Sequence, residues 1–132
     1  MGGPSFRAAS GGGAEANNAS VVLMVTTQGI RIMMSGDAEP EAQIPILRNG
    51  FDVHADVLKF PHHGSARQSE DFATAVGARV ATISVGKGND YGHPAPAALA
   101  LLKKLRVTSY RTDKQGDIAI VVRDHRISVI TR

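Results

Sequence analysis

The sequence lacks cysteine and tryptophan altogether, and it has only four phenylalanines and two tyrosines among its 132 residues. Without cysteine the chain can form no disulfide bond, no thiol nucleophile and no zinc site made of thiolates. Any metal ion would therefore be held by histidine, aspartate or glutamate. The shortage of aromatic side chains also argues against a surface that binds single-stranded nucleic acid on a row of stacking rings.

Long hydrophobic runs are missing as well. The unbroken apolar runs of residues 21–25 and 97–102 are both far below the roughly 20 residues that a membrane-spanning helix needs. The first residues contain no apolar core of a signal peptide. We therefore expect the chain itself to be a soluble fragment that makes no membrane contact.

Positive charge is concentrated in the C-terminal third. The net charge is +3, but from residue 101 onward eight lysines and arginines accompany three aspartates, a local excess of five positive charges. Such an excess suits a polyanionic partner such as DNA, and it equally suits a solvated surface of mixed charge. Charge alone does not decide between these two interpretations.

The pattern of apolar and turn-forming residues predicts one α/β domain. Residues 1–19 are rich in glycine, alanine, serine and asparagine and form a predicted flexible lead-in, so the domain would cover residues 20–132. The predicted strands are residues 21–26, 30–34, 56–60, 80–85, 109–111, 118–122 and 126–130, and the predicted helices are residues 39–49, 69–76 and 96–105. Pro45 predicts a kink in the first helix, or a helix that begins again near it, because a proline inside a helix loses a hydrogen bond. Strands that alternate with helices between two hairpins indicate a mixed sheet with flanking helices.

Polar residues follow three of the predicted strands at the points where the strands end. Asp37 comes after the second strand, His62 and His63 come after the third, and His93 ends a glycine-rich loop after the fourth. Each position has a simpler interpretation. The aspartate could cap the next helix, the paired histidines could be solvated loop residues, and the glycine-rich loop could be an ordinary strand-to-helix turn.

The three strand ends together favour a metal-hydrolase site over three unrelated loops. Side chains at successive strand ends of one sheet meet at the same edge. Carboxylate and imidazole ligands suit Zn²⁺, Mn²⁺ or Fe, and two ions bridged by an aspartate would activate water for phosphoryl chemistry. The other two histidines, His54 and His125, lie in a polar stretch and in a tight turn, and we expect both at the surface.

The motifs that carry these residues resemble the metallo-β-lactamase-like domain of the ComEC competence proteins of bacterial DNA uptake. The resemblance runs from about residue 17 to about residue 122 and rests on "IRIMMSGDAEPE", "ADVLKFPHHGSARQS", "ATISVGKGNDYGHPAPAAL" and "YRTDKQGDIAI". It implies an αββα sandwich and a metal-dependent phosphodiesterase acting on DNA, with two divalent ions, Zn or Mn, in the complete domain. It also implies a parent protein in the bacterial inner membrane with this domain outside the cytoplasm.

The resemblance assigns roles to individual residues. Asp37 takes the position of a bridging carboxylate, and a metal ligand falls on the histidine pair, where we favour His63 and place His62 in a supporting or substrate-facing position. His93 matches a histidine near the substrate phosphate, suited to an electrostatic or general-acid role, and His62 is a second catalytic candidate. The positions expected to contact substrate are Ser65, Asn89, Arg111 and Thr112.

One motif of the superfamily is missing. Its main metal-binding run, His-x-His-x-Asp-His, belongs to the first half of the sandwich, and none of the five histidines here forms it. The chain therefore resembles the C-terminal half of the domain, with the remaining ligands expected on a missing N-terminal half. Alone, it should bind metal weakly, cut DNA poorly or not at all, and form a homodimer through its uncovered sheet face.

Two other functions stay open on the sequence. A non-catalytic DNA-binding module would use the basic C-terminal third, and its DNA binding would depend steeply on salt and not on chelators. A hydrolase of another phosphoester, such as a phosphorylcholine or nucleotide ester, would keep the fold and differ in the shape of its pocket.

Overall fold

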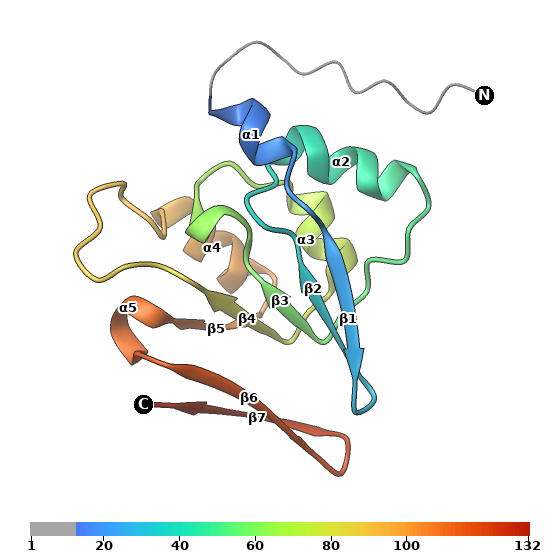
Figure 1. Ribbon diagram of the computed structural model, residues 1–132, viewed down its shortest axis with the longest axis vertical. Coiled ribbons are helices and arrows are strands. Elements are labelled where there is room, and N and C mark those ends of the chain that lie inside the picture. The colour runs from blue at the N-terminus through green and yellow to red at the C-terminus, as the bar shows by residue number, and fades with distance from the viewer. Residues whose placement is uncertain (1–12) are drawn as a thin grey trace.

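The computed structural model describes residues 13–132 (Figure 1). Five strands form the main sheet in the order β1-β2-β3-β4-β5. They are β1 (Leu23–Thr27), β2 (Ile30–Met34), β3 (Val57–Lys59), β4 (Val80–Ile83) and β5 (Thr108–Arg111). The first two pair antiparallel as a hairpin, and β2 to β5 run parallel. The predicted α/β architecture with a mixed sheet is confirmed.

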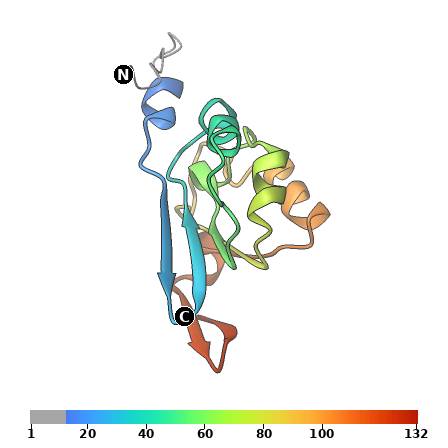
Figure 2. The ribbon, with the colours of Figure 1, turned by 90° about the vertical axis from the view of Figure 1, so that its right-hand side faces the viewer.

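Helices connect the parallel strands on one side of the sheet. They are α2 (Pro40–Arg48), α3 (Glu70–Val76) and α4 (Pro96–Lys104), and Figure 2 shows all three on the same side. Three short helices complete the set, namely α1 (Ala14–Asn18) before β1, η1 (Pro61–Gly64) after β3 and α5 (Thr112–Gln115) after β5. The sequence analysis did not predict these short helices.

The face of the sheet that carries the helices forms the core. The strand register places Met33, Leu58 and Ala81 side by side on β2, β3 and β4. All three are buried in one cluster with Phe72 of α3 and Leu102 of α4. Burying a large apolar side chain is worth about 1.5–3 kcal/mol, so this layer holds the strand ends, and the loops that follow them, at fixed positions.

The opposite face of the sheet is open where β1 pairs with β2. Leu23 and Met34 lie opposite each other in the register and are 51% and 37% exposed, and Val25 on the same face is 36% exposed. Figure 2 shows this face without a covering helix among the described residues. The strands β1 and β2 thus present apolar side chains on both faces, which is typical of a sheet that packs on two sides.

A second hairpin closes the chain. It consists of β6 (Ile118–Arg123) and β7 (Arg126–Thr131) and forms a separate two-stranded sheet. Its turn reaches the β1–β2 turn, where His125 lies against Gly29 (Figure 1). His125 and His54 are both exposed, as predicted.

Most predicted elements are present, with bounds shifted by a residue or two, and α3 follows its prediction closely. The Ser69 hydroxyl caps it by accepting a hydrogen bond from the Phe72 N–H across 3.2 Å, and Gly77 ends it in the left-handed conformation. The expectation of a new helix start near Pro45 is wrong, because α2 continues through that residue. The apolar residues after the proline pack against the core, and this packing offsets the lost hydrogen bond.

The predicted lead-in, residues 1–19, contains a helix that the sequence pattern did not predict. Residues 14–18 form α1, and the physical reason is tertiary. Asn18 and Ser20 accept hydrogen bonds from backbone N–H groups of the loop before α2, so this stretch is anchored to the domain. The rest of the lead-in, residues 1–12, lies outside the described residues.

Candidate functional site

The carboxyl ends of β2, β3 and β4 meet at one edge of the sheet, and the loops that follow them are tied together. The His62 N–H donates to the Gly36 carbonyl across 3.1 Å, which joins the loop after β3 to the loop after β2. The Ala95 N–H donates to the Gly64 carbonyl across 2.8 Å, which joins it to the loop before α4. The structure thus brings the three predicted strand-end loops into one surface.

His63 faces Asp37 at the centre of this surface. Its Nδ1 lies 2.7 Å from the Ser84 carbonyl oxygen, and because a carbonyl only accepts, Nδ1 carries the proton. The lone pair on Nε2 is left free, and Nε2 lies 3.5 Å from Oδ1 of Asp37. Metal-ligating histidines are fixed in this way, with one ring nitrogen donating to a carbonyl and the other facing the ion.

His62 is placed differently from its neighbour. Its Nδ1 is 3.3 Å from Oε1 of Glu39, although the two groups are not aligned as a hydrogen bond. Its ring meets the ring of His93 edge-on, with centroids 5.5 Å apart. The structure therefore directs His62 toward Glu39 and His93, whereas it directs His63 toward Asp37.

A strained turn presents the two histidines. Both have left-handed backbone conformations, with φ of 48° at His62 and 53° at His63. Each such residue costs about 1–2 kcal/mol when it is not glycine. The turn is closed by the Ser65 N–H, which donates to the His62 carbonyl across 2.9 Å. Strain of this kind is concentrated at functional sites, where the surrounding structure enforces it.

His93 completes the group of imidazoles. Its pKa lies below the ordinary value of 6.5, chiefly because burial disfavours the cation. Electrostatic interaction with His62 and His63 lowers this pKa further, and the Asp37 carboxylate acts in the opposite direction. At neutral pH, the His93 ring is therefore neutral and can accept a hydrogen bond.

Asn89 fixes the loop that carries His93. Its side-chain amide donates to the His93 carbonyl across 2.8 Å, and its Oδ1 accepts from the His93 N–H across 3.2 Å. It also donates to the Gly86 carbonyl across 3.1 Å. The predicted contact of Asn89 with substrate stays a prediction, and the structure gives this side chain a role in shaping the loop.

Ser65 and Thr112 are also engaged within the chain. The Ser65 hydroxyl is buried and accepts from the Arg67 N–H across 3.0 Å. The Thr112 hydroxyl accepts from the Val85 N–H across 2.8 Å and donates to the Val85 carbonyl across 2.7 Å. Thr112 thereby joins the end of β5 to the end of β4. Their predicted substrate contacts are not tested by this arrangement.

Arg111 is paired with Asp113. Two of its guanidinium nitrogens donate to the two carboxylate oxygens across 3.0 and 2.7 Å. This hydrogen-bonded pairing holds the pKa of Asp113 below its usual range. A phosphate approaching Arg111 would compete with this carboxylate, so the predicted phosphate contact requires the pair to open.

Glu39 is a residue of this region that the sequence analysis did not single out as a site residue. It is 4% exposed, and its second oxygen lies 3.3 Å from the Arg67 guanidinium. Asn17 donates to its first oxygen across 3.3 Å, and Asn18 accepts from its backbone N–H across 3.0 Å. No local signal reveals such a network, because its members are about twenty residues apart in sequence.

The donors present fit part of a divalent metal site. Asp37 and His63 offer one oxygen and one nitrogen that face each other. Among residues 13–132, no group of three or more histidine, aspartate or glutamate side chains is close enough to hold an ion. A zinc site takes three or four protein ligands, so the described residues do not form a complete one.

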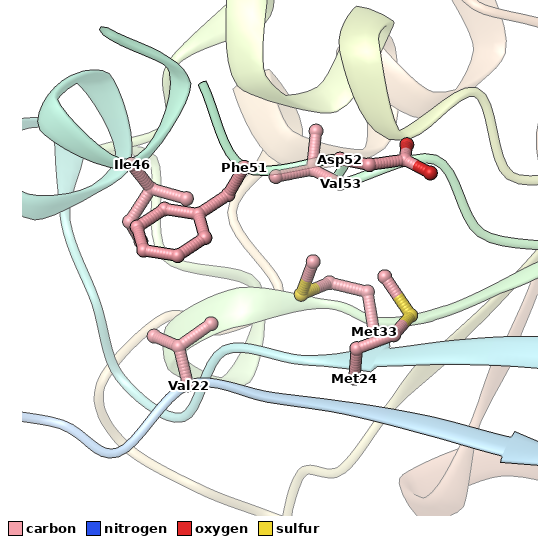
Figure 3. A pocket seen from close by; sticks show the side chains of 7 residues that line it. All are labelled: Val22, Met24, Met33, Ile46, Phe51, Asp52 and Val53. Carbon is pink, nitrogen blue, oxygen red and sulfur yellow. The ribbon is translucent and has the colours of Figure 1, made fainter. Parts of the chain in front are cut away.

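The structure also contains an apolar pocket, whose lining side chains are shown in Figure 3. Its volume is about 250 Å³. Its lining residues are Val22, Met24, Met33, Ile46, Phe51, Asp52 and Val53. It shares no residue with the imidazole cluster and contains a single charged side chain, so it offers no set of groups for acid–base or metal chemistry.

Comparison with known proteins places this geometry in context. Over 106 residues, 80% of the chain, the sequence is 38% identical to ComE operon protein 3 (ComEC) of Bacillus subtilis (strain 168). The chain is related in sequence to part of this ComEC protein. This confirms the predicted relationship, while the metallo-β-lactamase part of the prediction rests on the motifs alone. The ComEC-related chain spans 14% of the length of ComE operon protein 3.

The other comparisons add no further relative. No family model matches the ComEC-related chain, and no solved structure matches it. None of the helices between residues 13 and 132 combines the length and the apolar character needed to cross a bilayer.

Proposed function

We propose that this chain supplies part of the site of a metal-dependent phosphodiesterase domain in a ComEC-type DNA-uptake protein. The observation that carries the proposal is the pairing of Asp37 with His63. The free Nε2 lies 3.5 Å from the carboxylate, and the other ring nitrogen is fixed on a backbone carbonyl. Relationship to ComEC and the strand-end motifs support DNA as the substrate and the metallo-β-lactamase-like sandwich as the fold.

The proposed divalent ion, Zn or Mn, would bind between Asp37 and His63 and would supply a Lewis acid and activated water when present. Its remaining ligands would come from a segment outside this chain. His93 stands beside this pair with its ring neutral, where its ring N–H is suited to donate a hydrogen bond to a phosphate oxygen and its bare ring nitrogen to accept one from a water. His62 would keep His93 in position through their edge-on contact.

We also propose that a further segment of the parent protein packs on the open face of β1 and β2. The exposed Leu23, Val25 and Met34 support this, because a contiguous apolar patch is typically an interaction surface. The chain's small share of its relative's length leaves room for such a segment. In isolation, we expect this face to pair with a second copy.

A sedimentation experiment tests this second proposal. Val25→Lys should shift the isolated chain toward monomer. Ile44→Lys is the matched control, because Ile44 is equally exposed, at 36%, but lies on α2. A wild-type chain that stays monomeric at every concentration, or an Ile44→Lys effect as large as that of Val25→Lys, would contradict the proposal.

The structure adds no support for the alternative of a non-catalytic DNA-binding module that uses the basic C-terminal third. Lys103 and Lys104 lie in the last turn of α4, and Arg106 follows it. Because α4 begins at the site edge of the sheet, its end lies at the other edge. Arg123 and Arg126 flank the turn of the second hairpin, near the β1–β2 turn. These cations therefore do not gather beside the imidazoles. Recognition of phosphorylcholine would require several aromatic rings around the cation, and the described site has one exposed ring, Tyr91.

Metal binding by the isolated chain is the first test of the phosphodiesterase proposal. Titration calorimetry with Mn²⁺ or Zn²⁺ should show weak binding that Asp37→Ala and His63→Ala both abolish. His125→Ala is the control, because that histidine is exposed in a distant turn. Equal binding by all four proteins would contradict the assignment.

The second test uses the parent protein. Asp37→Ala there should abolish metal-dependent cleavage of DNA, and retained cleavage would contradict the assignment. If the isolated chain held two ions and cut DNA at the parent's rate, the proposal of a site shared with another segment would be wrong.

A further inference from the structure

Tyr91 stands out next to the imidazole cluster. Its side chain is 80% exposed, more than any other large apolar or aromatic side chain among the described residues. Its ring lies 6.2 Å from the ring of His93, with an angle of 38° between the planes. A single exposed aromatic residue is common on a protein surface, but Tyr91 is carried by a hydrogen-bonded loop and stands beside His93.

The loop that carries Tyr91 is built by specific hydrogen bonds. Asn89 joins both ends of the loop. Its backbone N–H and its side-chain amide both donate to the Gly86 carbonyl. The side-chain amide also donates to the His93 carbonyl, and the side-chain oxygen accepts from the His93 N–H. Tyr91 lies between Asn89 and His93, so its backbone is restrained from both directions. A ring on a restrained backbone has fewer conformations to lose when a ligand stacks on it.

The surroundings of the ring are open. Gly88 and Gly92 flank this part of the loop, and nothing lies within 4 Å of the position that a Cβ would take at either residue. Lys87 in the same loop is exposed. A flat ligand with a phosphate attached can therefore reach the exposed Tyr91 ring while its phosphate lies at His93, whose ring is 6.2 Å away.

We propose that Tyr91 is a stacking platform for one unpaired nucleobase of a DNA strand whose phosphate lies at His93. The proposal rests on the proposed phosphodiester site and adds the base as a second point of recognition. Bases inside a duplex are already stacked on both faces, so only an unpaired base can use the ring. The platform therefore makes the site selective for single-stranded DNA with little regard to sequence, since every base has a π face.

The test compares two oligonucleotides that differ only in their bases. A fluorescent thymidine ten-mer and an abasic ten-mer with the same phosphates are titrated with the chain, and binding is followed by polarisation. The thymidine strand should bind about tenfold more tightly than the abasic strand, as expected for one stacked base. Tyr91→Ala should remove this advantage without changing abasic binding, and Tyr91→Phe should keep it.

Two variants separate this proposal from the one it rests on. Phe51→Ala is the matched control, since Phe51 is 67% exposed but lines the separate apolar pocket, and it should bind both strands like the wild type. His93→Ala should weaken binding of both strands. Suppose that His93→Ala weakens binding of both strands. If Tyr91→Ala then weakens binding of the thymidine and abasic strands equally, or leaves binding of both unchanged, the stacking proposal is wrong. If neither strand binds, or His93→Ala changes nothing, the phosphodiester site itself is wrong and the stacking proposal fails with it.

Discussion

Replacing Gly64 by alanine should separate the two histidine-bearing loops. Gly64 has φ of +81° and lies in the turn directly after His63. A Cβ added there would lie 2.5 Å from the Cβ and 2.9 Å from the Cα of Pro94, and 3.3 Å from a methyl carbon of Ile83. The proline is buried and cannot turn away as a flexible side chain would. The contact must therefore be relieved by moving the loop that carries His93.

The expected loss of unfolding free energy in Gly64→Ala has two parts. The left-handed conformation costs a non-glycine residue about 1–2 kcal/mol, and overpacking a closely packed position costs about 1–3 kcal/mol. Together, Gly64→Ala should lower the free energy of unfolding by about 2–5 kcal/mol, a large share of the roughly 5–15 kcal/mol of a typical domain. Gly50→Ala is the matched control, because Gly50 has φ of +75° but no atom within 4 Å of the added Cβ. It should show the backbone cost alone.

Urea unfolding followed by circular dichroism measures both variants, since the unfolding free energy falls linearly with urea. Gly64→Ala should be less stable than Gly50→Ala by about 1–3 kcal/mol. Its amide NMR spectrum should also show shifts at His93 that the control lacks. If the two variants were equally stable and His93 did not shift, the close approach of the two loops would be refuted.

Three further predictions concern the same surface. Thr112→Val should cost about 1–3 kcal/mol in the same urea assay, because the Val85 N–H and carbonyl lose the hydroxyl that both contact; an unchanged midpoint would contradict this structural role. Asn89→Ala should raise the hydrogen-exchange rate of the His93 amide about tenfold, since the acceptor at 3.2 Å is lost, and unchanged exchange would count against it. In metal-free protein, NMR should find the His93 ring titrating below 6.5, and Asp37→Asn should lower its pKa further, because the carboxylate favours the cation. Because the pKa of His93 is lower in the folded chain, the unfolded chain binds this proton more readily. The free energy of unfolding should therefore fall as the pH drops below 6.5 through the folded pKa. An NMR titration midpoint of His93 at or above 6.5 would contradict the burial argument.

Short-range sequence signals predicted the structure correctly where a residue acts on its near neighbours in the chain. Ser69 caps α3 and Gly77 ends it, as their types and positions predicted. The resemblance to ComEC was likewise readable from short motifs. By contrast, Pro45 indicated a kink or a new helix start, and α2 continues through it without a new start. The packing of the residues after Pro45 on the core is a long-range effect that the local rule omits.

The fold gives the two adjacent histidines different partners. The sequence favoured His63 only by analogy, whereas the structure distinguishes them by their partners, since His63 faces Asp37 and His62 faces Glu39. The orientation of His63 is set by the Ser84 carbonyl, which is 21 residues away in sequence. No local pattern contains that information.

By itself, the sequence determined the kinds of groups available and the order in which they come. The absence of cysteine restricted any metal ligand to oxygen and imidazole, and the strand ends placed Asp37, His63 and His93 at one edge of a mixed sheet. Only the tertiary structure decided which side chains are free to act. Asn89 and Thr112 are engaged in holding loops together, and Tyr91 is left exposed beside His93. The physical reason is that a hydrogen bond or a packed contact between distant segments depends on distances that exist only once the chain has folded.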